Sequence, residues 1–423
     1  MNEVKPANRR DFLKGTTVAA AGIALAGGLD LSRAAHAAGS DELKIALIGC
    51  GGRGGGAVSD CLSSCENVKL IAVADAFADN AKDKLAELRK DEDIVKKIDV
   101  PDDRIFAGFD AYEKAIAAGP DIVLLTTPPG FRPIHYAAAI AAGKHVFMEK
   151  PCCTDAPGFR SLMETNKRAD EKGLKVVVGL QRRHSREFLG KVKRIQEGSL
   201  GKLMFMRAYW NNGPIWVRER KPGQTEMEYQ MRNWYHFVWL CGDHILEQHV
   251  HNLDVCNWVK GDHPVTANGV GSCQCRPDNR KIGQIYDNHF VEFTYKDGTK
   301  LYGQCRQQPN IWNTVTQYVH GTKGAMELPG GGGDGYKKEH VHLVNAIRKG
   351  EKLNDGWHGA TSSFTALLGR MATYSGQEVY WDEAVAKGPG EMPTKFAFDA
   401  DPPVMPDKDG NYPQPVPGVY KPY

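Results

Sequence analysis

The sequence has little net charge and, apart from its N-terminus, no long apolar run. Its 54 Lys and Arg residues nearly balance 51 Asp and Glu residues, which leaves a formal net charge of +3. No basic cluster alternates with aromatic residues, and this argues against nucleic acid as a partner. Beyond the N-terminus no stretch approaches about 18 apolar residues, so we expect a soluble mature chain without a stable membrane span.

Cysteine occurs ten times, but its positions do not suggest a disulfide framework. Cys152 and Cys153 are adjacent, and Cys273 and Cys275 share one face of an expected strand. The latter pair has no second pair at zinc-ligand spacing, so no metal site is predicted there. We therefore expect mostly buried thiols.

The N-terminus carries the features of a twin-arginine export signal. Asn8-Arg-Arg-Asp-Phe-Leu-Lys14 precedes an apolar, Ala- and Gly-rich stretch from Gly15 to Leu29, and Ala35-His-Ala37 forms a small-x-small cleavage site. We interpret residues 1–37 as a signal peptide and expect a periplasmic protein whose partner during export is the twin-arginine translocase. Because this route carries folded proteins, a cofactor would be loaded in the cytoplasm.

From residue 43 to about residue 180 the pattern alternates between strands and helices. Strand-like runs occur at 43–48, 68–74, 121–127, 144–148 and 174–180. Helical patterns separate them at 54–65, 78–98, 110–118, 131–142 and 157–172. This alternation predicts a doubly wound parallel sheet, which we assign to a domain over residues 38–180. The charged segment from Leu88 to Asp103 is expected to be an exposed insertion.

Beyond Gln181 the pattern changes, and a second domain is expected over 181–385. Strand-like runs occur at 202–210, 266–276, 287–295, 299–307 and 313–320. Helical patterns occur at about 242–259, 336–349 and 362–375, with a glycine run at 330–333 that we interpret as a flexible joint. This predicts an α+β domain with a large, open, mostly antiparallel sheet. Nine prolines mark the tail, 386–423, which we expect to lie extended along the surface or across a neighbouring subunit.

A glycine-rich turn directly follows the first strand. It reads Gly49-Cys-Gly-Gly-Arg-Gly54, and a helix and a second strand that ends in Asp75 come after it. This series is the dinucleotide-binding fingerprint, in which Gly49 permits the tight turn, Gly51 lets the backbone approach a pyrophosphate, and Gly54 lets the helix pack closely. The N-terminus of that helix favours phosphate. The first domain is therefore predicted to be a Rossmann domain.

Asp75 decides the expected cofactor. A carboxylate at this position accepts hydrogen bonds from ribose hydroxyls and repels a 2′-phosphate. Ala76 and Phe77 follow it, so no neighbouring Arg is available to hold a phosphate. NAD is predicted rather than NADP.

Two further strands end in motifs that carry chemistry. The third ends in Thr126-Thr-Pro-Pro129, with His135 in the following helix, and the fourth ends in Glu149-Lys-Pro151. Ligands of open α/β sheets bind at the carboxyl ends of strands, so Lys150 is expected to point toward the site and to bond a substrate hydroxyl or the nicotinamide ribose.

Together these motifs resemble those of the Gfo/Idh/MocA oxidoreductase family, which includes glucose–fructose oxidoreductase and inositol dehydrogenase. The resemblance rests on the glycine turn, the Thr-Pro run with His135, and Gly143-Lys-His-Val-Phe-Met-Glu-Lys-Pro151, and it extends to about residue 385. It implies a second domain whose open sheet binds substrate and often forms a dimer interface, so a homodimer or homotetramer is expected. The expected cofactor-binding residues are Gly49, Cys50, Gly51, Gly52, Arg53, Gly54, Asp75, Thr126, Thr127, Pro128, His135, Glu149 and Lys150.

A second cluster of polar residues lies within Gly242–Asp254. At helical spacing Glu247, His251 and Asp254 fall close to one face. By resemblance His251 matches the catalytic His or Tyr of the family, Glu247 stands where the acid is usually Asp, and His249 stands where Gly is common. His244, His249 and His251 with Glu247 do not have the spacing of helical zinc patterns, so no metal is predicted.

These residues suit the oxidation of an alcohol. The hydroxyl must lose its proton as the hydride leaves, and a neutral imidazole such as His251 can accept that proton. Lys150 would stabilise the developing alkoxide, while Glu247 would either orient His251 or polarise Lys150. We predict these three as the catalytic set.

Expected substrate-binding residues come from three further segments. Arg182 and Arg183 follow the last Rossmann strand, although a surface Arg pair is an equal alternative. Two stretches rich in Trp and amides suit sugar faces and hydroxyls, and packing in the core or an interface is the alternative. The predicted substrate-binding residues are Arg182, Arg183, Trp210, Asn211, Trp234 and His249.

Three functions remain open from the sequence. The first is an exported NAD(P)-dependent oxidoreductase of a sugar, sugar derivative or polyol, with a tightly bound and internally recycled cofactor because free NAD is scarce outside the cytoplasm. The second is a redox-neutral glycoside hydrolase that acts through a transient 3-keto sugar. The third is a non-catalytic sugar- or cofactor-binding protein, against which the set Lys150, Glu247 and His251 argues.

Overall fold

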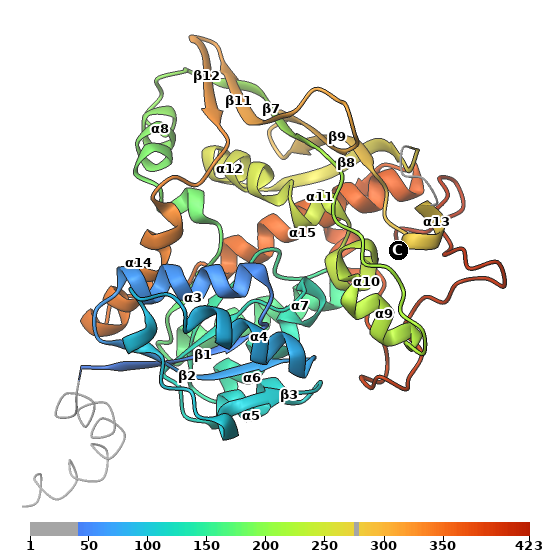
Figure 1. Cartoon of the computed structure of the whole chain (residues 1–423). Helices are drawn as coiled ribbons and strands as arrows, with labels where there is room; N and C mark the ends of the chain where they lie inside the picture. The colour runs from blue at the N-terminus through green and yellow to red at the C-terminus, as the bar shows by residue number, and fades with distance from the viewer. Residues whose placement is uncertain (1–40, 275–278) are drawn as a thin grey trace, which may run out of the picture. The chain divides into compact units, whose positions relative to one another are not determined.

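The computed structural model describes residues 41–274 and 279–423 (Figure 1). The predicted signal peptide, 1–37, and Cys275 lie outside these residues. From Lys44 to Tyr423 the described chain forms one compact unit, which contains two sheets. The domain boundaries at 180 and 385 stay predictions.

Within the described residues, six parallel strands form the first sheet in the order β3-β2-β1-β4-β5-β6. They are β1 (Leu43–Ile48), β2 (Val68–Asp75), β3 (Ile105–Ala107), β4 (Ile122–Leu125), β5 (His145–Met148) and β6 (Val176–Val178). The connecting helices are α3 (Gly52–Ser64), α4 (Ala78–Leu88), α5 (Ala111–Ala117), α6 (Arg132–Ala141) and α7 (Ala156–Glu171). The central strands are apolar and buried because helices cover both faces (Figure 1). The predicted doubly wound sheet is confirmed.

The helix predicted over 78–98 is too long. Helix α4 ends at Leu88, and the chain continues through buried Ile94 and a 3₁₀ turn at Val95–Lys97. Asp99 then donates its N–H to the Leu70 carbonyl, and the short strand β3 follows. Tertiary pairing with β2 therefore overrides the helical pattern, and the segment predicted as an exposed insertion contributes buried side chains.

The second sheet has seven strands among the described residues, in the order β12-β11-β7-β10-β9-β8-β13. They are β7 (Leu203–Asn212), β8 (Pro264–Ser272), β9 (Asn288–Tyr295), β10 (Lys300–Gln307), β11 (Thr314–Gly321), β12 (Gly324–Pro329) and β13 (Val379–Tyr380). Strands β7 and β10 are parallel, and the other neighbouring pairs of the described sheet are antiparallel. The predicted mostly antiparallel sheet is confirmed, whereas β12 and β13 were not predicted.

Helix α15 (Gly356–Ser375) joins the part of the chain built on the first sheet, the first half, to the part built on the second sheet, the second half. It is buried along nearly its whole length and packs on β8, on α7 and on α12 (Val250–Lys260). Helix α14 (Gly335–Lys349) returns to the first half and lies beside α3 (Figure 1). The remaining helices are α8 (Arg186–Gln196), α9 (Glu226–Arg232), α10 (Val238–Cys241), α11 (His244–Glu247), α13 (Asn279–Ile282) and α16 (Trp381–Lys387).

The helix predicted over 242–259 is broken. Gly242 and Asp243 both have positive φ, at 77° and 78°, so α11 begins only at His244. It ends at Glu247, and α12 begins at Val250. The expected common face of Glu247, His251 and Asp254 is therefore wrong.

The described tail, 388–423, contains no helix or strand. Phe398 stacks against Phe77 at 5.2 Å and against Phe109 at 4.8 Å between ring centres. Tyr412 is buried against Phe237. Apolar contacts of this kind hold the tail in place without regular hydrogen bonding.

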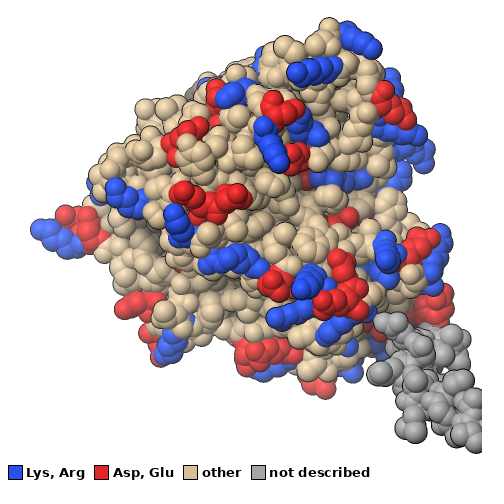
Figure 2. All heavy atoms as spheres, turned by 180° about the vertical axis from the view of Figure 1, so that it is seen from behind, with Lys and Arg blue, Asp and Glu red and all other residues tan. Residues whose placement is uncertain are grey.

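The burial of the cysteines and the mixing of charges on the surface agree with what the composition predicts. All nine cysteines of the described chain are free, and each except Cys273 is buried. Acidic and basic side chains are interspersed over the face shown in Figure 2. No helix among the described residues is both long and apolar enough to cross a bilayer.

Candidate active site

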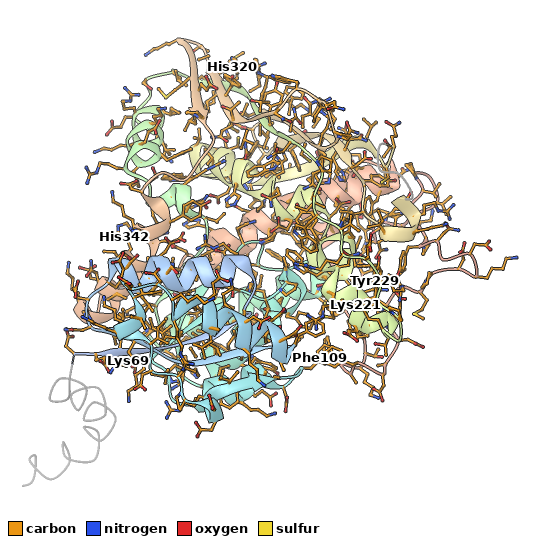
Figure 3. All side chains as sticks on the ribbon, viewed as in Figure 1. Lys69, Phe109, Lys221, Tyr229, His320 and His342 are labelled. Carbon is orange, nitrogen blue, oxygen red and sulfur yellow. The ribbon has the colours of Figure 1, made fainter. Side chains whose placement is uncertain are left out.

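A cleft of about 1530 Å³ lies at the carboxyl ends of β1, β2, β4 and β5. Segments of both halves line it. Phe109 of the first half and Lys221 of the segment after β7 lie on the same side of the molecule in Figure 3 and are two of its lining residues. All of the predicted cofactor-binding residues except Cys50 line this cleft.

The glycine turn forms one end of the cleft. Gly49 has φ +103°, and a Cβ at Gly54 would lie 2.1 Å from the Gly49 carbonyl oxygen. Both glycines are therefore needed for the turn and the close approach of α3. Apart from the adjoining residues and the nearby backbone of α3, no atom of the described residues lies within 4 Å of a Cβ added at Gly51 or Gly52. The turn fits a pyrophosphate because the backbone there is open and precedes the N-terminus of α3.

Asp75 is anchored at the end of β2 by three donors. Its carboxylate accepts the N–H groups of Cys50 at 2.7 Å and Phe77 at 3.0 Å, and the Asn80 amide at 3.2 Å. Burial raises the pKa of Asp75, and the two backbone hydrogen bonds oppose this shift. The thiol of Cys50 turns inward to the Ala74 carbonyl, so Cys50 lies outside the cleft and the prediction for it is corrected.

An arginine reaches the Asp75 corner from a distant part of the chain. Arg232, at the end of α9, places its guanidinium 3.7 Å from the centre of the Phe77 ring. It also forms a bidentate pair with Asp79, at 2.8 and 3.0 Å. The expectation that no arginine stands near this corner is wrong, because tertiary structure brings in a residue that the local sequence does not show.

Buried polar contacts hold the ends of β4 and β5 together. Arg132 donates to the Thr127 carbonyl at 2.6 Å and to the Glu149 carbonyl at 3.0 Å. Thr127 Oγ1 lies 3.2 Å from His135 Nδ1, and burial lowers the pKa of His135 to about 3. His135 is therefore a neutral imidazole on the cleft wall.

Glu149 forms an ion pair with Arg53 of the glycine turn. Its Oε1 lies 3.1 Å from Arg53 Nε, and Arg53 Nη2 lies 3.1 Å from Asp60 Oδ2. The Arg53 guanidinium also lies 5.2 Å from the centre of the Tyr336 ring. Glu149 thus fixes Arg53 beside the turn.

Lys150 forms a buried ion pair with Glu247. Its Nζ lies 2.9 Å from Glu247 Oε1 and donates to the Glu247 carbonyl at 2.5 Å. Gln248 donates to the other Glu247 oxygen. Burial raises the pKa of Glu247, and the Lys150 charge opposes the shift. These contacts favour the alternative in which Glu247 polarises Lys150.

His251 lies beside this pair on the cleft wall. It is the second residue of α12, and its ring stacks on Trp210 at 5.8 Å between centres. Burial, together with the charges of Lys150 and Arg182, holds the pKa of His251 well below its usual range. A neutral imidazole in this position can accept a proton from a substrate hydroxyl.

This lowered pKa predicts an unusual pH dependence. Protonated His251 cannot accept a proton, so activity is lost only as pH falls through its folded-state pKa, well below the ordinary value of about 6.5. We expect kcat/KM to stay level as pH is lowered from about 7.5 through 6.5. A loss of half the activity near pH 6.5 or above in steady-state assays would contradict this assignment.

Some of the predicted substrate-binding residues line the cleft, and others are buried behind its wall. Arg182, Trp210 and Trp234 line the cleft. Asn211 faces the other side of β7 because alternate strand residues point in opposite directions, and it is fully buried. His249 is also fully buried, close to Gly303 of β10. Neither lines the cleft, and both predictions are corrected.

Arg183 is likewise outside the cleft. It donates to both oxygens of Asp254 at 2.8 to 3.0 Å, and its guanidinium lies 5.2 Å from the centre of the Trp258 ring. Ser362 donates to the same carboxylate. Arg183 therefore contributes to the packing of the second half and not to the cleft.

Several cleft residues were not predicted. Tyr336 is the second residue of α14, shortly after the glycine run, and its hydroxyl accepts a hydrogen bond from Gln181 at 2.9 Å. The glycine run itself was the signal, because a Cβ at Gly332 would lie 2.3 Å from Gln181 Cγ. The others include Asn212, Trp216, Arg218, Arg232 and Gln248.

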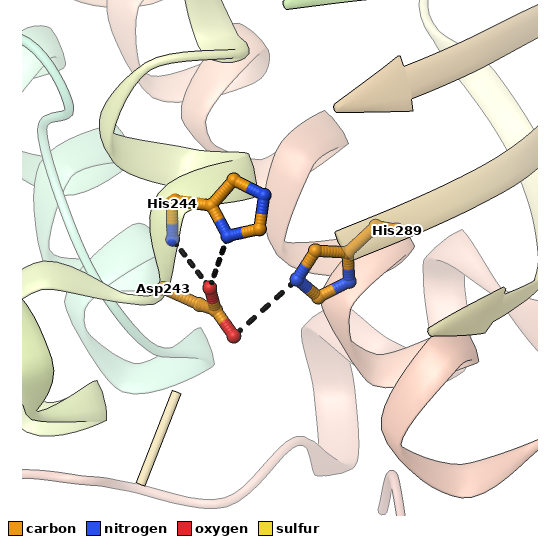
Figure 4. A group of neighbouring side chains, drawn as sticks. All are labelled: Asp243, His244 and His289. Carbon is orange, nitrogen blue, oxygen red and sulfur yellow. Dashed lines mark hydrogen bonds and ion pairs between the residues drawn. The ribbon is translucent and has the colours of Figure 1, made fainter. Parts of the chain in front are cut away.

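Within the described chain, Asp243, His244 and His289 form a buried group whose spacing suits a metal (Figure 4). The Asp243 carboxylate, however, already accepts bonds from His244 Nδ1 at 2.9 Å, the Tyr286 N–H at 2.9 Å and the Tyr374 hydroxyl at 2.5 Å. The His244 N–H donates to it as well, at 2.5 Å. We interpret the group as a hydrogen-bonded hub that supports the start of α11.

Comparisons with known proteins agree with this geometry. Residues 43–180 match the family described as "Oxidoreductase family, NAD-binding Rossmann fold" (GFO_IDH_MocA), and residues 6–26 match the twin-arginine translocation pathway signal sequence. Inositol 2-dehydrogenase of Klebsiella pneumoniae is 25% identical over 68% of this chain and 74% of that protein. Inositol 2-dehydrogenase/D-chiro-inositol 3-dehydrogenase of Halalkalibacterium halodurans is 28% identical over 80% of this chain and 93% of that protein.

A solved structure shows the same fold. The scyllo-inositol dehydrogenase of Lactobacillus casei with bound NAD(H) and scyllo-inositol has a TM-score of 0.63 at 18% identity and covers 81% of this chain and 99% of that chain. Residues 43–180 thus form an NAD-binding Rossmann domain of the Gfo/Idh/MocA oxidoreductase family, and the chain carries a twin-arginine signal sequence.

Proposed function

We propose that this protein oxidises a secondary hydroxyl of a polyol or sugar and transfers the hydride to NAD⁺. The observation that carries the proposal is the Lys150–Glu247 pair, at 2.9 Å, in the same cleft as His251 and the open glycine turn. The inositol dehydrogenases among its relatives support a polyol substrate. The comparisons lend no support to the glycoside hydrolase alternative.

The proposed mechanism assigns one task to each residue. The cofactor, held by the glycine turn and Asp75, supplies the hydride acceptor. Lys150 donates a hydrogen bond to the substrate oxygen and stabilises negative charge as it develops, while Glu247 positions Lys150. His251 accepts the hydroxyl proton, because its lowered pKa keeps it neutral. The stacked Trp210 fixes the imidazole plane.

The signal sequence supports export to the periplasm with the cofactor already bound. The proposed oxidation then needs a bound cofactor that a second substrate reoxidises, because free NAD is scarce outside the cytoplasm. Exposed apolar side chains on the second sheet, among them Val270 and Phe290, support a homodimer or homotetramer through that face.

The test uses mature protein from the periplasm of cells that export it. We expect denaturation to release stoichiometric NAD(H), and we expect the absorbance of reduced nicotinamide to rise when the native protein meets myo- or scyllo-inositol or a free sugar. A second sugar should reverse the signal. Nucleotide-free protein that neither binds nor reduces added NAD would overturn the proposal.

The same site predicts the choice of cofactor. Asp75→Asn removes the charge that repels a 2′-phosphate but keeps an oxygen acceptor, and Arg232 already lies at this corner. We expect the ratio of NADP to NAD use, as kcat/KM, to rise about tenfold or more. In an Arg232→Met background the rise should be smaller. An unchanged ratio in both backgrounds would show that Asp75 does not face the ribose.

A further inference from the structure

Arg182 is a buried cation that forms an ion pair with no carboxylate of the described residues. It is 2% exposed, and its Nη1 donates to Asn252 Oδ1 at 3.1 Å and Gln317 Oε1 at 3.2 Å. Its Nε has no hydrogen-bond partner among the described residues. The neighbouring Arg183 takes the one nearby carboxylate, Asp254, through three hydrogen bonds. The guanidinium of Arg182 therefore forms no ion pair of its own among the described residues, and the Asp254 charge acts on it without direct contact.

The surroundings of Arg182 are built for this cation. The Asn252 amide nitrogen donates to the carbonyls of Tyr209 and Thr316, and the Gln317 amide nitrogen donates to the Leu328 carbonyl. The backbone thus fixes both amides so that their oxygens face Arg182. A buried charge without a counter-ion is costly, and a fixed guanidinium suits a planar carboxylate.

The position of Arg182 points to the substrate. It lines the cleft together with Trp210 and His251. Its charge is one of those that lower the pKa of His251, which places it near the proposed proton acceptor. Because the glycine turn would bind the cofactor pyrophosphate, Arg182 is available to bind the substrate.

We propose that Arg182 binds a carboxylate of the substrate, so that the preferred substrate is a sugar acid or polyol acid. This inference rests on the proposed function and narrows its substrate class. One guanidinium without an ion pair matches the single charge of a carboxylate better than the two charges of a phosphate monoester. A neutral polyol would leave the buried charge unpaired.

The test compares substrates that differ only in the carboxylate. D-Glucuronate is measured against D-glucose, and D-galacturonate against D-galactose, with the NAD-loaded protein in both steady-state assays and calorimetric titrations. We expect kcat/KM to favour the acid of each pair by about 10- to 100-fold, mainly through KM, as for a hydrogen bond to a charged group. Arg182→Met should abolish the preference, and Arg182→Lys should restore part of it.

Lys193→Met is the matched control, because it removes one positive charge from the exposed face of α8. It should leave the preference unchanged. Equal or better use of the neutral sugars by the wild-type protein overturns the inference even if Arg182→Met does not fold. Binding of D-glucuronate that Arg182→Met loses, without any reduction of NAD, would support the subsite and overturn the proposed function instead. Oxidation of neutral inositols alone, without use of the sugar acids, would support the proposed function and overturn the inference for Arg182.

Discussion

Replacing Lys150 by methionine is expected to lower kcat by about 10²- to 10⁴-fold. Methionine has similar length but cannot donate a hydrogen bond to the substrate oxygen or stabilise its developing charge. It also leaves the buried Glu247 carboxylate without its cation, at a site where the two groups lie 2.9 Å apart. The nucleotide content should change little, because the glycine turn and Asp75 hold the cofactor. Steady-state kinetics and the nucleotide released on denaturation measure the two effects separately.

Two further variants make this prediction sharper. Lys191→Met removes a partly exposed lysine that pairs with Glu187 on α8, and it should leave kcat unchanged. Glu247→Gln keeps the shape of the positioning residue but not its charge, so we expect a smaller loss than for Lys150→Met, together with a shifted pH profile. Full activity of Lys150→Met with retained nucleotide would remove Lys150 from the mechanism.

Replacing Asp243 by asparagine is expected to destabilise the fold by about 3–5 kcal/mol, as for two lost hydrogen bonds to a charged group. The carboxylate is fully buried and accepts a bond from His244 (Figure 4). It also accepts bonds from Tyr286 and Tyr374. An asparagine NH₂ group would face donors that have no other acceptor in this hub. Urea unfolding followed by circular dichroism at pH 7 measures the loss.

The pH dependence of stability gives an independent check on Asp243. Burial alone would raise its pKa, but His289 and His244 hold the pKa well below its usual range. A carboxyl group with a depressed folded-state pKa stabilises the fold above its unfolded pKa of about 3.9 and loses this contribution as pH falls below that value. Asp243→Asn should lack this acid-dependent component.

Asp297→Asn serves as the control for that series. Asp297 pairs with Lys260 at an exposed site, so its replacement should cost less than about 1 kcal/mol. A loss as small for Asp243→Asn as for this control would show that the hub contributes no more than a surface ion pair. Recovery of stability with added Zn²⁺ would favour the metal interpretation of the group over ours.

The fold was predictable where local pattern and tertiary packing agree. Strands β1 and β2 are apolar runs that end in a glycine turn and in an acid, and both are buried on both faces. The sequence pattern and the structure therefore give the same elements there. The prediction failed where a non-local contact decides the conformation. The segment after Leu88 leaves its helix to pair with β2, and the helix expected over 242–259 breaks at two residues of positive φ.

The candidate site shows the same division. Gly49, Asp75 and Lys150 were predicted because each stands at a strand end, whereas Glu247 and His251 were predicted from the family resemblance. Tyr336 and Arg232 were missed because they reach the cleft from α14 and α9, far along the chain. His249 and Asn211 were wrongly included because the side to which a buried side chain points depends on the register of its own element.

The sequence by itself therefore determined the order of strands and helices in the first half (except for β3), the glycine turn, the export signal and the residue types of the proposed catalytic set. These properties depend on neighbours within a few residues, and short-range pattern is sufficient for them. Only the tertiary structure decided that Glu247 pairs with Lys150, that Asp254 belongs to Arg183, and that Arg182 is left as a buried cation that pairs with no carboxylate of the described residues. Such pairings depend on which side chains burial brings together, and burial is a property of the whole fold.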